Sequence, residues 1–360
     1  MKKIYLIYGL AWVLALSTVF FFSHASSVHR EEEETEEYHS QFTRGQIADI
    51  SGSKIDLRLP EEGGKIVKTE LSDFYLHDDY KPGDKVSVYV SQNDAGEKQY
   101  DVADYYHMDG LIFSFIIFAL LAIIVARKKG FYSIISVILS LFFFYGITVN
   151  AIQSDIPIII AGIIYVFLIT VLTIPLIHGF NKKSASAIIA VNVGYIIGFL
   201  LTYFFTAVAK IGNTPTEHFR TLFIQFPDIE IRQILIISLF LGAVGALIDV
   251  AVSICSAVFE GIEDHARATF KKVYNLGMSV GRDILGSMVN TLLIAYLAGS
   301  FPFLVLITLG GFHNPNELIN YDFIALELTR IFIGATSIIL LIPITSVVTA
   351  YLLLKQKTIK

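Results

Sequence analysis

Long, uninterrupted blocks of apolar residues dominate the pattern of hydrophobic and polar positions along this chain. A helix needs about 20 apolar residues to cross the roughly 30 Å hydrocarbon core of a bilayer, where backbone polar groups find no water. The blocks therefore predict an all-α membrane bundle of about eight transmembrane helices. The predicted spans are Ile4–Ser23, Leu111–Ala126, Phe131–Thr148, Ile156–His178, Ala185–Ala209, Ile234–Ala257, Ile284–Leu309 and Ile331–Leu354.

Between the first two blocks the pattern changes to short alternating runs separated by turn residues. The turn Pro82-Gly83-Asp84, followed by the alternating run Lys85–Val90, is the clearest example. Five such runs predict a small all-β, OB-like domain over residues 41–107. The predicted strands are Gly45–Ser51, Lys54–Leu59, Lys65–Leu71, Lys85–Val90 and Tyr100–Asp104.

These patterns divide the chain into four parts: an N-terminal anchor (1–23), an acidic linker (24–40), the β domain (41–107) and a seven-helix transmembrane domain (108–360). The linker holds Glu31–Glu34 and Glu36–Glu37, which favours a solvated stalk over a cation-capturing arm. A cleaved signal peptide is the alternative for the first span, but its apolar run is longer than the usual signal core.

Basic residues fall unevenly between alternate loops. With the N-terminus inside, fourteen Lys and Arg lie on the cytoplasmic side, whereas the opposite short loops hold Lys210, Arg220, Arg232 and Arg330. The positive-inside rule then predicts an even number of spans, both termini in the cytoplasm, and residues 24–107 outside the cell membrane. Because the basic residues are scattered, a nucleic-acid partner is excluded, and the lipid bilayer is the expected partner.

Composition narrows the class further. Hydrophobic residues make up 54% of the chain, and the mean hydropathy of +0.63 excludes an ordinary soluble domain. The single cysteine, Cys255, cannot form an internal disulfide. No Walker A, Gly-x-Ser-x-Gly, His-Glu-x-x-His or Cys-x-x-Cys pattern occurs, so we expect no enzyme activity, cofactor or metal. His77-Asp78-Asp79 is interpreted as a solvated acidic loop.

The sixth predicted span carries small and polar residues at three- and four-residue steps, which places them on one helix face. They are Gly242, Gly245, Ala246, Asp249, Ser253, Ser256 and Glu260. Small residues allow membrane helices to approach closely, and Gly242-x-x-x-Ala246 has the four-residue spacing of small residues that is typical of such contacts. Glu260 lies at the cytoplasmic edge.

The seventh predicted span repeats this pattern with Gly286, Asn290 and Thr291. Asp249 and Asn290 each lie roughly 12–14 Å from the cytoplasmic end of their spans, at about 1.5 Å per residue, and are predicted to pair. Arg282 and Asp283 mark the membrane edge, as either an interfacial charge pair or a gate.

Asp249 is the central candidate residue. An unpartnered charge at that depth costs several kcal/mol, so such an acid is paired, protonated or facing a water-filled cavity. The functional interpretation is that Asp249 binds or carries a cation or proton. The structural alternative is a protonated side chain that hydrogen-bonds Asn290 or a serine. An intramembrane protease would need a second acid at matching depth, and Asp283 is too close to the edge.

Between these two spans, apolar residues again recur at helical spacing, with basic residues beside them. They predict an amphipathic helix on the inner membrane surface. The apolar positions are Phe259, Ile262, Ala266, Phe270 and Val273.

Several of these motifs together resemble the YibE/F-like membrane proteins of bacteria. The resemblance rests on an anchor, a small β domain, Tyr100–Tyr106 before a span, the run Gly242–Asp249 with Ser253, Ser256 and Glu260, and Gly281-Arg282-Asp283 with Gly286, Met288 and Asn290–Leu292. It implies a multi-pass membrane protein and no particular activity. A fainter similarity to the proton-relay helices of the resistance–nodulation–division superfamily favours cation or proton coupling.

The sequence therefore predicts a transporter or permease, ion- or proton-coupled, with Asp249 and Asn290 at its centre. The alternative is a non-transporting membrane scaffold or sensor subunit that uses the outer β domain. A homo-oligomer, or a hetero-oligomer with a related membrane protein, is compatible with either function.

Overall fold

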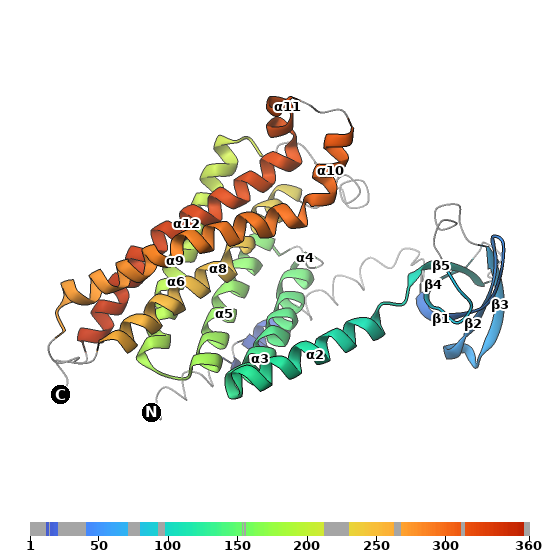
Figure 1. Cartoon of the computed structure of the whole chain (residues 1–360), viewed down its shortest axis with the longest axis horizontal. Coiled ribbons are helices and arrows are strands. Elements are labelled where there is room, and N and C mark those ends of the chain that lie inside the picture. The colour runs from blue at the N-terminus through green and yellow to red at the C-terminus, as the bar shows by residue number, and fades with distance from the viewer. Residues whose placement is uncertain are drawn as a thin grey trace. The chain divides into compact units, whose positions relative to one another are not determined.

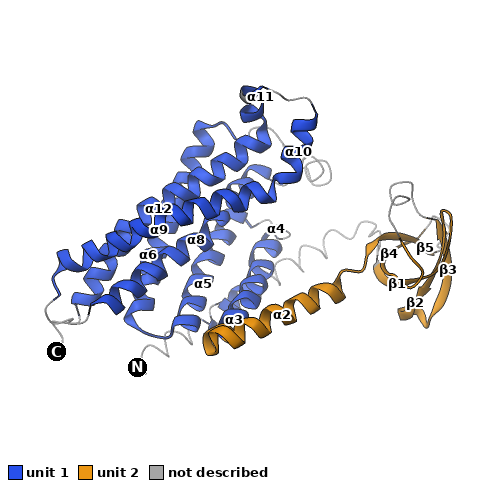
Figure 2. Ribbon diagram, in the orientation of Figure 1, with its two compact units in different colours: residues 1–30, 132–360 blue, residues 31–131 orange. Residues whose placement is uncertain are grey.

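The computed structural model describes residues 12–13, 15–20, 41–70, 80–92, 98–152, 154, 156–211, 230–262, 268–310 and 314–355. The chain divides into two compact units, residues 31–131 and residues 1–30 with 132–360 (Figure 2). The first unit groups the predicted β domain with the helix that follows it. The acidic linker and His77-Asp78-Asp79 lie outside the described residues.

Unit 31–131 contains a five-stranded antiparallel sheet (Figure 1) with strand order β3-β2-β1-β4-β5. The small antiparallel sheet predicted from the sequence is confirmed, while its OB-like assignment stays a prediction. Tight turns at Gly52 (φ +67°) and Gly83 (φ +100°) need the left-handed region that glycine tolerates. The strands are β1 (Gln41–Ser51), β2 (Lys54–Leu59), β3 (Lys65–Glu70), β4 (Lys85–Gln92) and β5 (Lys98–Tyr105), with a 3₁₀ turn η1 (Pro60–Glu62).

The sheet has a core of its own because alternate residues point to one side. Val86, Val88 and Val90 of β4 lie there, in one cluster with Ile55 and Leu57 of β2. After β5 the chain enters α2 (Met108–Ala126), which is almost entirely apolar beyond Asp109 in its first turn and has no buried residue.

The outer strands β3 and β5 are joined by side chains. Thr69 Oγ1 donates to the Tyr100 carbonyl at 2.5 Å, and Lys98 Nζ lies 2.8 Å from Glu62 Oε1. Tyr100 Oη also donates to Glu62, at 3.0 Å. These contacts link β3 and η1 to β5 across the two edges of the sheet, which closes into a half-barrel.

The other unit is helical. Helical residues 12–13 and 15–20 contribute Trp12, Ala15 and Val19 to a cluster with Phe143 and Ile147. The remaining elements are α3 (Lys128–Phe143), a π-helical turn η2 (Phe144–Val149), α4 (Asn150–Ile152), α5 (Ile158–His178), α6 (Lys182–Val208), α8 (Ile231–Gly261), α9 (Phe270–Gly299), α10 (Phe301–Leu309), α11 (Pro315–Asn320) and α12 (Asp322–Leu354).

Helix α12 is the centre of this bundle and packs against α6, α8 and α9 (Figure 1). Gly194 and Gly198 of α6 face Leu341 and Ser337 of α12, and the order of these contacts makes the two helices antiparallel. Glycines at four-residue spacing let helix backbones approach closely. Gly277 and Gly281 of α9 do the same against Ser346 and Ile342 of α12.

Six described helices are long and apolar enough to cross a membrane, or seven if α9 and α10 form one bent span. The predicted first span falls largely outside the described residues. The span predicted over Ile284–Leu309 bends by 59° after Gly299. Pro302, at the start of α10, accounts for the break because proline removes a backbone donor and clashes with the preceding turn.

The amphipathic surface helix predicted between the sixth and seventh spans is not formed as one element by the described residues. Phe259 belongs to the end of α8, while Phe270 and Val273 lie in the first turn of α9; Ala266 is outside the described residues. Helix α9 begins fourteen residues before the predicted span. Thr269 caps it, since its hydroxyl accepts from the Lys272 amide at 3.3 Å.

Candidate functional site

The polar face predicted for the sixth span lies on α8. Gly245, Asp249 and Ser253 are exposed on the isolated chain, and Ser256 is half-buried. The opposite side of α8 is apolar and fully buried, with Leu247, Val250, Ile254 and Cys255 at 0% exposure. Helix α8 is therefore amphipathic within the bundle, and its carboxylate lies on the uncovered side.

The matching residues of the seventh span lie on α9. Asp283, Gly286, Asn290 and Thr291 are all exposed. Thr291 Oγ1 donates to the Ser287 carbonyl of its own helix, at 2.8 Å, so that hydroxyl is satisfied locally. The polar side of α9 is thus also uncovered.

Two contacts fix the register of α8 against α9. Tyr296 Oη donates to the Gly242 carbonyl at 2.5 Å, and a Cβ on Gly261 would lie 3.3 Å from Leu276 Cδ2. The two helices are antiparallel. When one residue of α8 and one residue of α9 lie at the same depth, their two residue numbers therefore add up to nearly the same value. Asp249 and Asn290 fit that register, which places them level to within about one helical turn of 5.4 Å.

Equal depth does not make Asp249 and Asn290 partners within one chain. No hydrogen bond joins them, and neither side chain has a hydrogen-bond or ion-pair partner among the residues that the structure describes. Their predicted pairing is therefore absent from the isolated chain, because both side chains point away from the packed sides of their helices.

The charges predicted to lie at the cytoplasmic edge are separate from this pair. Glu260 accepts from Lys183 Nζ of α6 at 3.1 Å, in a pair whose Glu260 side chain is mostly exposed. Arg282 and Asp283 are exposed and form no ion pair within the described part of the chain. Exposed ion pairs contribute about 0–1 kcal/mol, so these charges have little effect on the stability of the bundle.

The small residues of the predicted face have different surroundings. A Cβ on Gly242 would lie 2.7 Å from Tyr296 Oη and 3.3 Å from Arg330 Cδ, whereas Gly245 and Gly286 have no such neighbour within 4 Å. Ala246 is half-buried against the core. Gly242 therefore makes room within the chain, while Gly245 and Gly286 leave the backbone uncovered.

A largely buried ion pair lies next to Gly242. Arg330 Nη1 donates to both carboxylate oxygens of Glu327, one turn earlier on α12, at 2.8 and 3.0 Å. The guanidinium carbon lies 5.5 Å from the Tyr296 ring centroid. Helices α8, α9 and α12 thus meet at one polar network.

This network is not predicted by the sequence pattern. Arg330 is expected in an outer loop, whereas α12 begins at Asp322 and carries Arg330 into the bundle. The available signal was Glu327-x-x-Arg330, an opposite-charge pair at i, i+3 beside an apolar run. The glycine pairs that pack α6 and α9 on α12 were missed as well, although each has Gly-x-x-x-Gly spacing.

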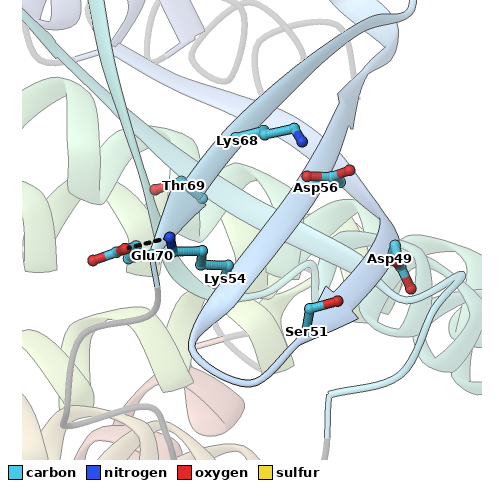
Figure 3. A pocket seen from close by; sticks show the side chains of 7 residues that line it. All are labelled: Asp49, Ser51, Lys54, Asp56, Lys68, Thr69 and Glu70. Carbon is cyan, nitrogen blue, oxygen red and sulfur yellow. Dashed lines mark ion pairs between the residues drawn. The ribbon is translucent and has the colours of Figure 1, made fainter.

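In unit 31–131, charged side chains line a shallow hollow of about 400 Å³ on the sheet (Figure 3). Lys54 Nζ lies 3.8 Å from Glu70 Oε1, and both side chains are mostly exposed. Such a solvated surface gives no specific chemistry. Among the described residues, no cluster of His, Cys, Asp and Glu suits a metal ion. The lining residues are Asp49, Ser51, Lys54, Asp56, Lys68, Thr69 and Glu70.

The contacts of Glu62 in the half-barrel shift the pKa values of the three side chains involved. Hydrogen bonds from Lys98 and Tyr100 lower the pKa of Glu62 below its usual 4.5. The same contact raises the pKa of Lys98, and burial with the Glu62 hydrogen bond raises that of Tyr100. The closure of the sheet is therefore favoured while Glu62 is ionised.

Comparison with protein families matches residues 114–355 to the YibE/F-like protein family. The match covers the apolar helices, including the polar faces of α8 and α9, and leaves out the β sheet. Comparison with curated proteins and with solved structures finds no match. A family match over more than half of the chain, on a bundle of helices apolar enough to cross a bilayer, shows that this is a multi-pass membrane protein that belongs to the YibE/F-like family.

Proposed function

We propose that this protein is a membrane transporter or permease, coupled to protons or another cation, in which Asp249 is the coupling group. The observation that carries the proposal is the position of Asp249 in α8, twelve residues before the helix ends at Gly261. At 1.5 Å per residue this is roughly 18 Å along the helix. Ionisable groups at such depth mark substrate or ion pathways in membrane proteins.

The surroundings of Asp249 favour a working carboxylate over a structural one. A residue that locks a bundle needs a partner in the bundle, and Asp249 has none among the described residues. Ser253, four residues further along α8, is exposed on the same face. Its hydroxyl and the carboxylate offer oxygen atoms, the ligands that hard cations prefer.

Substitution of Asp249 by Asn tests this proposal, since Asn keeps the side-chain shape but cannot ionise. Purified protein in liposomes is given an inward pH gradient or a Na⁺ or K⁺ gradient, and flux is followed with entrapped dyes. We expect Asp249→Asn to insert and remain monodisperse but to lose at least tenfold in flux. Asn192→Ala is the matched control because, within the described part of the chain, the Asn192 side chain bonds to no group but the Ile188 carbonyl of its own helix, at 2.8 Å. Full flux in Asp249→Asn would refute the coupling role.

The proposal includes an arrangement in the membrane. Eight spans, both termini in the cytoplasm and the β sheet outside the cell membrane follow from the fourteen-to-four distribution of basic residues. The alternating directions of α6, α8, α9 and α12, which their contacts establish, support this alternation. No enzymatic step is proposed for the chain.

A sensor or scaffold subunit is the second candidate. It is favoured by the separate core of the sheet and by the exposed Phe42 ring, which packs against the partly buried Tyr89 with ring centroids 5.3 Å apart. Labelling of Asp249→Cys with a water-soluble thiol reagent, in a Cys255→Ala background, distinguishes the two. A transporter admits water to that position during its cycle, whereas a scaffold keeps it dry.

A further inference from the structure

The uncovered polar face of the bundle consists of Gly245, Asp249 and Ser253 on α8 and Gly286, Asn290 and Thr291 on α9; we call it the polar face. Lipid tails offer no hydrogen-bond partner, so a carboxylate and a carboxamide at mid-span cost free energy unless another polar group covers them. The polar face therefore needs an occupant.

The bundle itself does not provide one. Rotation of α9 to turn Asn290 inward would lose the close approach of Gly277 to Ser346 and of Gly281 to Ile342. Rotation of α8 would lose the buried contact of Cys255 Sγ with Thr349 Oγ1, at 3.2 Å. Both helices are held with the polar face outward.

Neither α2 nor the described residues of the first predicted span provide a cover for this face. Beyond its first turn, α2 carries only Ser114 as a polar side chain. The helical residues 15–20 contribute Ala15 and Val19 to a different cluster, around Phe143 and Ile147. The occupant must instead supply a donor for Asp249 and an acceptor for Asn290 at mid-span.

A second copy of this chain meets that requirement through symmetry. Two copies inserted with the same orientation are related by an axis along the membrane normal, which leaves the depth of every residue unchanged. Asp249 and Asn290 lie at the same depth within one chain. Asp249 of one copy therefore lies at the same depth as Asn290 of the second copy, and Asn290 of the first copy at the same depth as Asp249 of the second. The carboxamide donates and the carboxylate accepts, so one two-fold contact satisfies both pairs.

We propose that the polar face is the interface of a homodimer, in which Asp249 of each copy accepts a hydrogen bond from Asn290 of the other. Gly245 and Gly286, whose added Cβ atoms would meet nothing within 4 Å, leave space for the second copy's helices to approach. The inference goes beyond transport and does not depend on it, since a sensor or scaffold would dimerise through the same face.

Cross-linking between two differently tagged copies tests the geometry. In a Cys255→Ser background, which removes the thiol but keeps a hydrogen-bonding group beside Thr349, one copy carries Ser253→Cys and the other Gly286→Cys, which lie at equal depth in the register described above. A disulfide needs Cα atoms within about 7 Å, so a band with both tags reports direct contact. The control pair is Ile196→Cys with Leu200→Cys on α6, at 64% and 62% exposure.

The purified protein is used in liposomes at low density, so that only a second copy is present as a partner. We expect the doubly tagged band for the α8–α9 pair and not for the α6 pair. Equal bands for both pairs, or only monomers in single-molecule bleaching, would overturn the proposal.

A dimerisation constant provides the second measurement. Asn290→Ala removes both symmetric hydrogen bonds and should raise the dimer dissociation constant about eightfold, as judged by energy transfer between labelled copies on dilution into lipid. Asn192→Ala, whose side chain bonds within its own helix, should leave the constant unchanged. An identical constant for Asn290→Ala and Asn192→Ala, in protein that still inserts, would show that Asn290 is not at the interface.

Discussion

Arg330 and Glu327 form an ion pair one turn apart on α12, in which Arg330 Nη1 alone donates to both carboxylate oxygens, at 2.8 and 3.0 Å. Their side chains are 19% and 10% exposed. The Nε atom of Arg330 is buried and has no hydrogen-bond partner among the described residues. Tyr296 stacks on the guanidinium and bonds to Gly242, so the pair connects α12 to both α8 and α9.

Removal of one member of this pair should be more damaging than removal of both. Arg330→Met leaves the Glu327 carboxylate buried without its partner and should lower the free energy of unfolding by about 3–5 kcal/mol. The double variant Glu327→Leu/Arg330→Met removes both charges and should unfold close to the wild type. Chemical unfolding in detergent, followed by intrinsic fluorescence, measures the three proteins. If the single and double variants lose the same free energy of unfolding, leaving Glu327 without its partner has no extra cost and the prediction is wrong.

A methyl group at Gly281 should disrupt the packing of α9 on α12. The added Cβ would overlap Ile342 Cγ2, and both helix backbones are fixed at this point. We expect Gly281→Ala to lower the free energy of unfolding by about 1–3 kcal/mol, the usual cost of overpacking. Gly299→Ala on the same helix is the matched control, because its Cβ would meet nothing within 4 Å. The thermal midpoints of the two variants in detergent should differ clearly, and coincident midpoints would contradict the close approach.

The sheet should fold by itself as residues 41–105 and show a pH dependence due to Glu62. A group with a lowered pKa in the folded state stabilises the fold above its unfolded pKa, and that contribution disappears as the pH falls through the folded pKa. The melting temperature of the wild type should therefore decrease once the pH is lowered below about 4.5, the usual pKa of a glutamate side chain.

Glu62→Gln removes the ionisable group and is the control for that experiment. Its melting temperature should start lower at pH 7 and change less on acidification. Circular dichroism between pH 7 and pH 3 follows both proteins. A random-coil spectrum for the wild type at pH 7 would show that the sheet needs the rest of the chain, and parallel pH curves would rule out Glu62.

Reporters fused along the chain test the proposed topology. Fusions after Gln153 and Asn316 should report the outside, and one after Asn181 the inside, because the basic residues of alternate loops differ so strongly. A cytoplasmic signal at Gln153 would contradict the eight-span arrangement. Alkaline phosphatase and green fluorescent protein are complementary reporters for this purpose.

The local patterns of the sequence determined most of the elements. Alternation in Lys85–Val90 and glycines at the turns predicted the strands to within a few residues, because strand faces and tight turns depend on neighbouring residues alone. Long apolar runs predicted the helices for the same reason. Helix α9 was predicted too short because Phe270–Arg282 is only partly apolar, and hydropathy does not detect a helix that extends past the hydrocarbon.

Contacts between distant residues were decided only by the tertiary structure. The sequence placed Asp249 and Asn290 at one depth, since depth follows from counting residues along each helix. It did not show that both side chains face outward, because the rotation of a helix depends on which glycines approach which partner: Gly281 on Ile342, and Gly242 on Tyr296. Glu327 and Arg330 were unrecognised for the same reason, since their burial depends on α9 lying across them, and that arrangement is a property of the packed bundle.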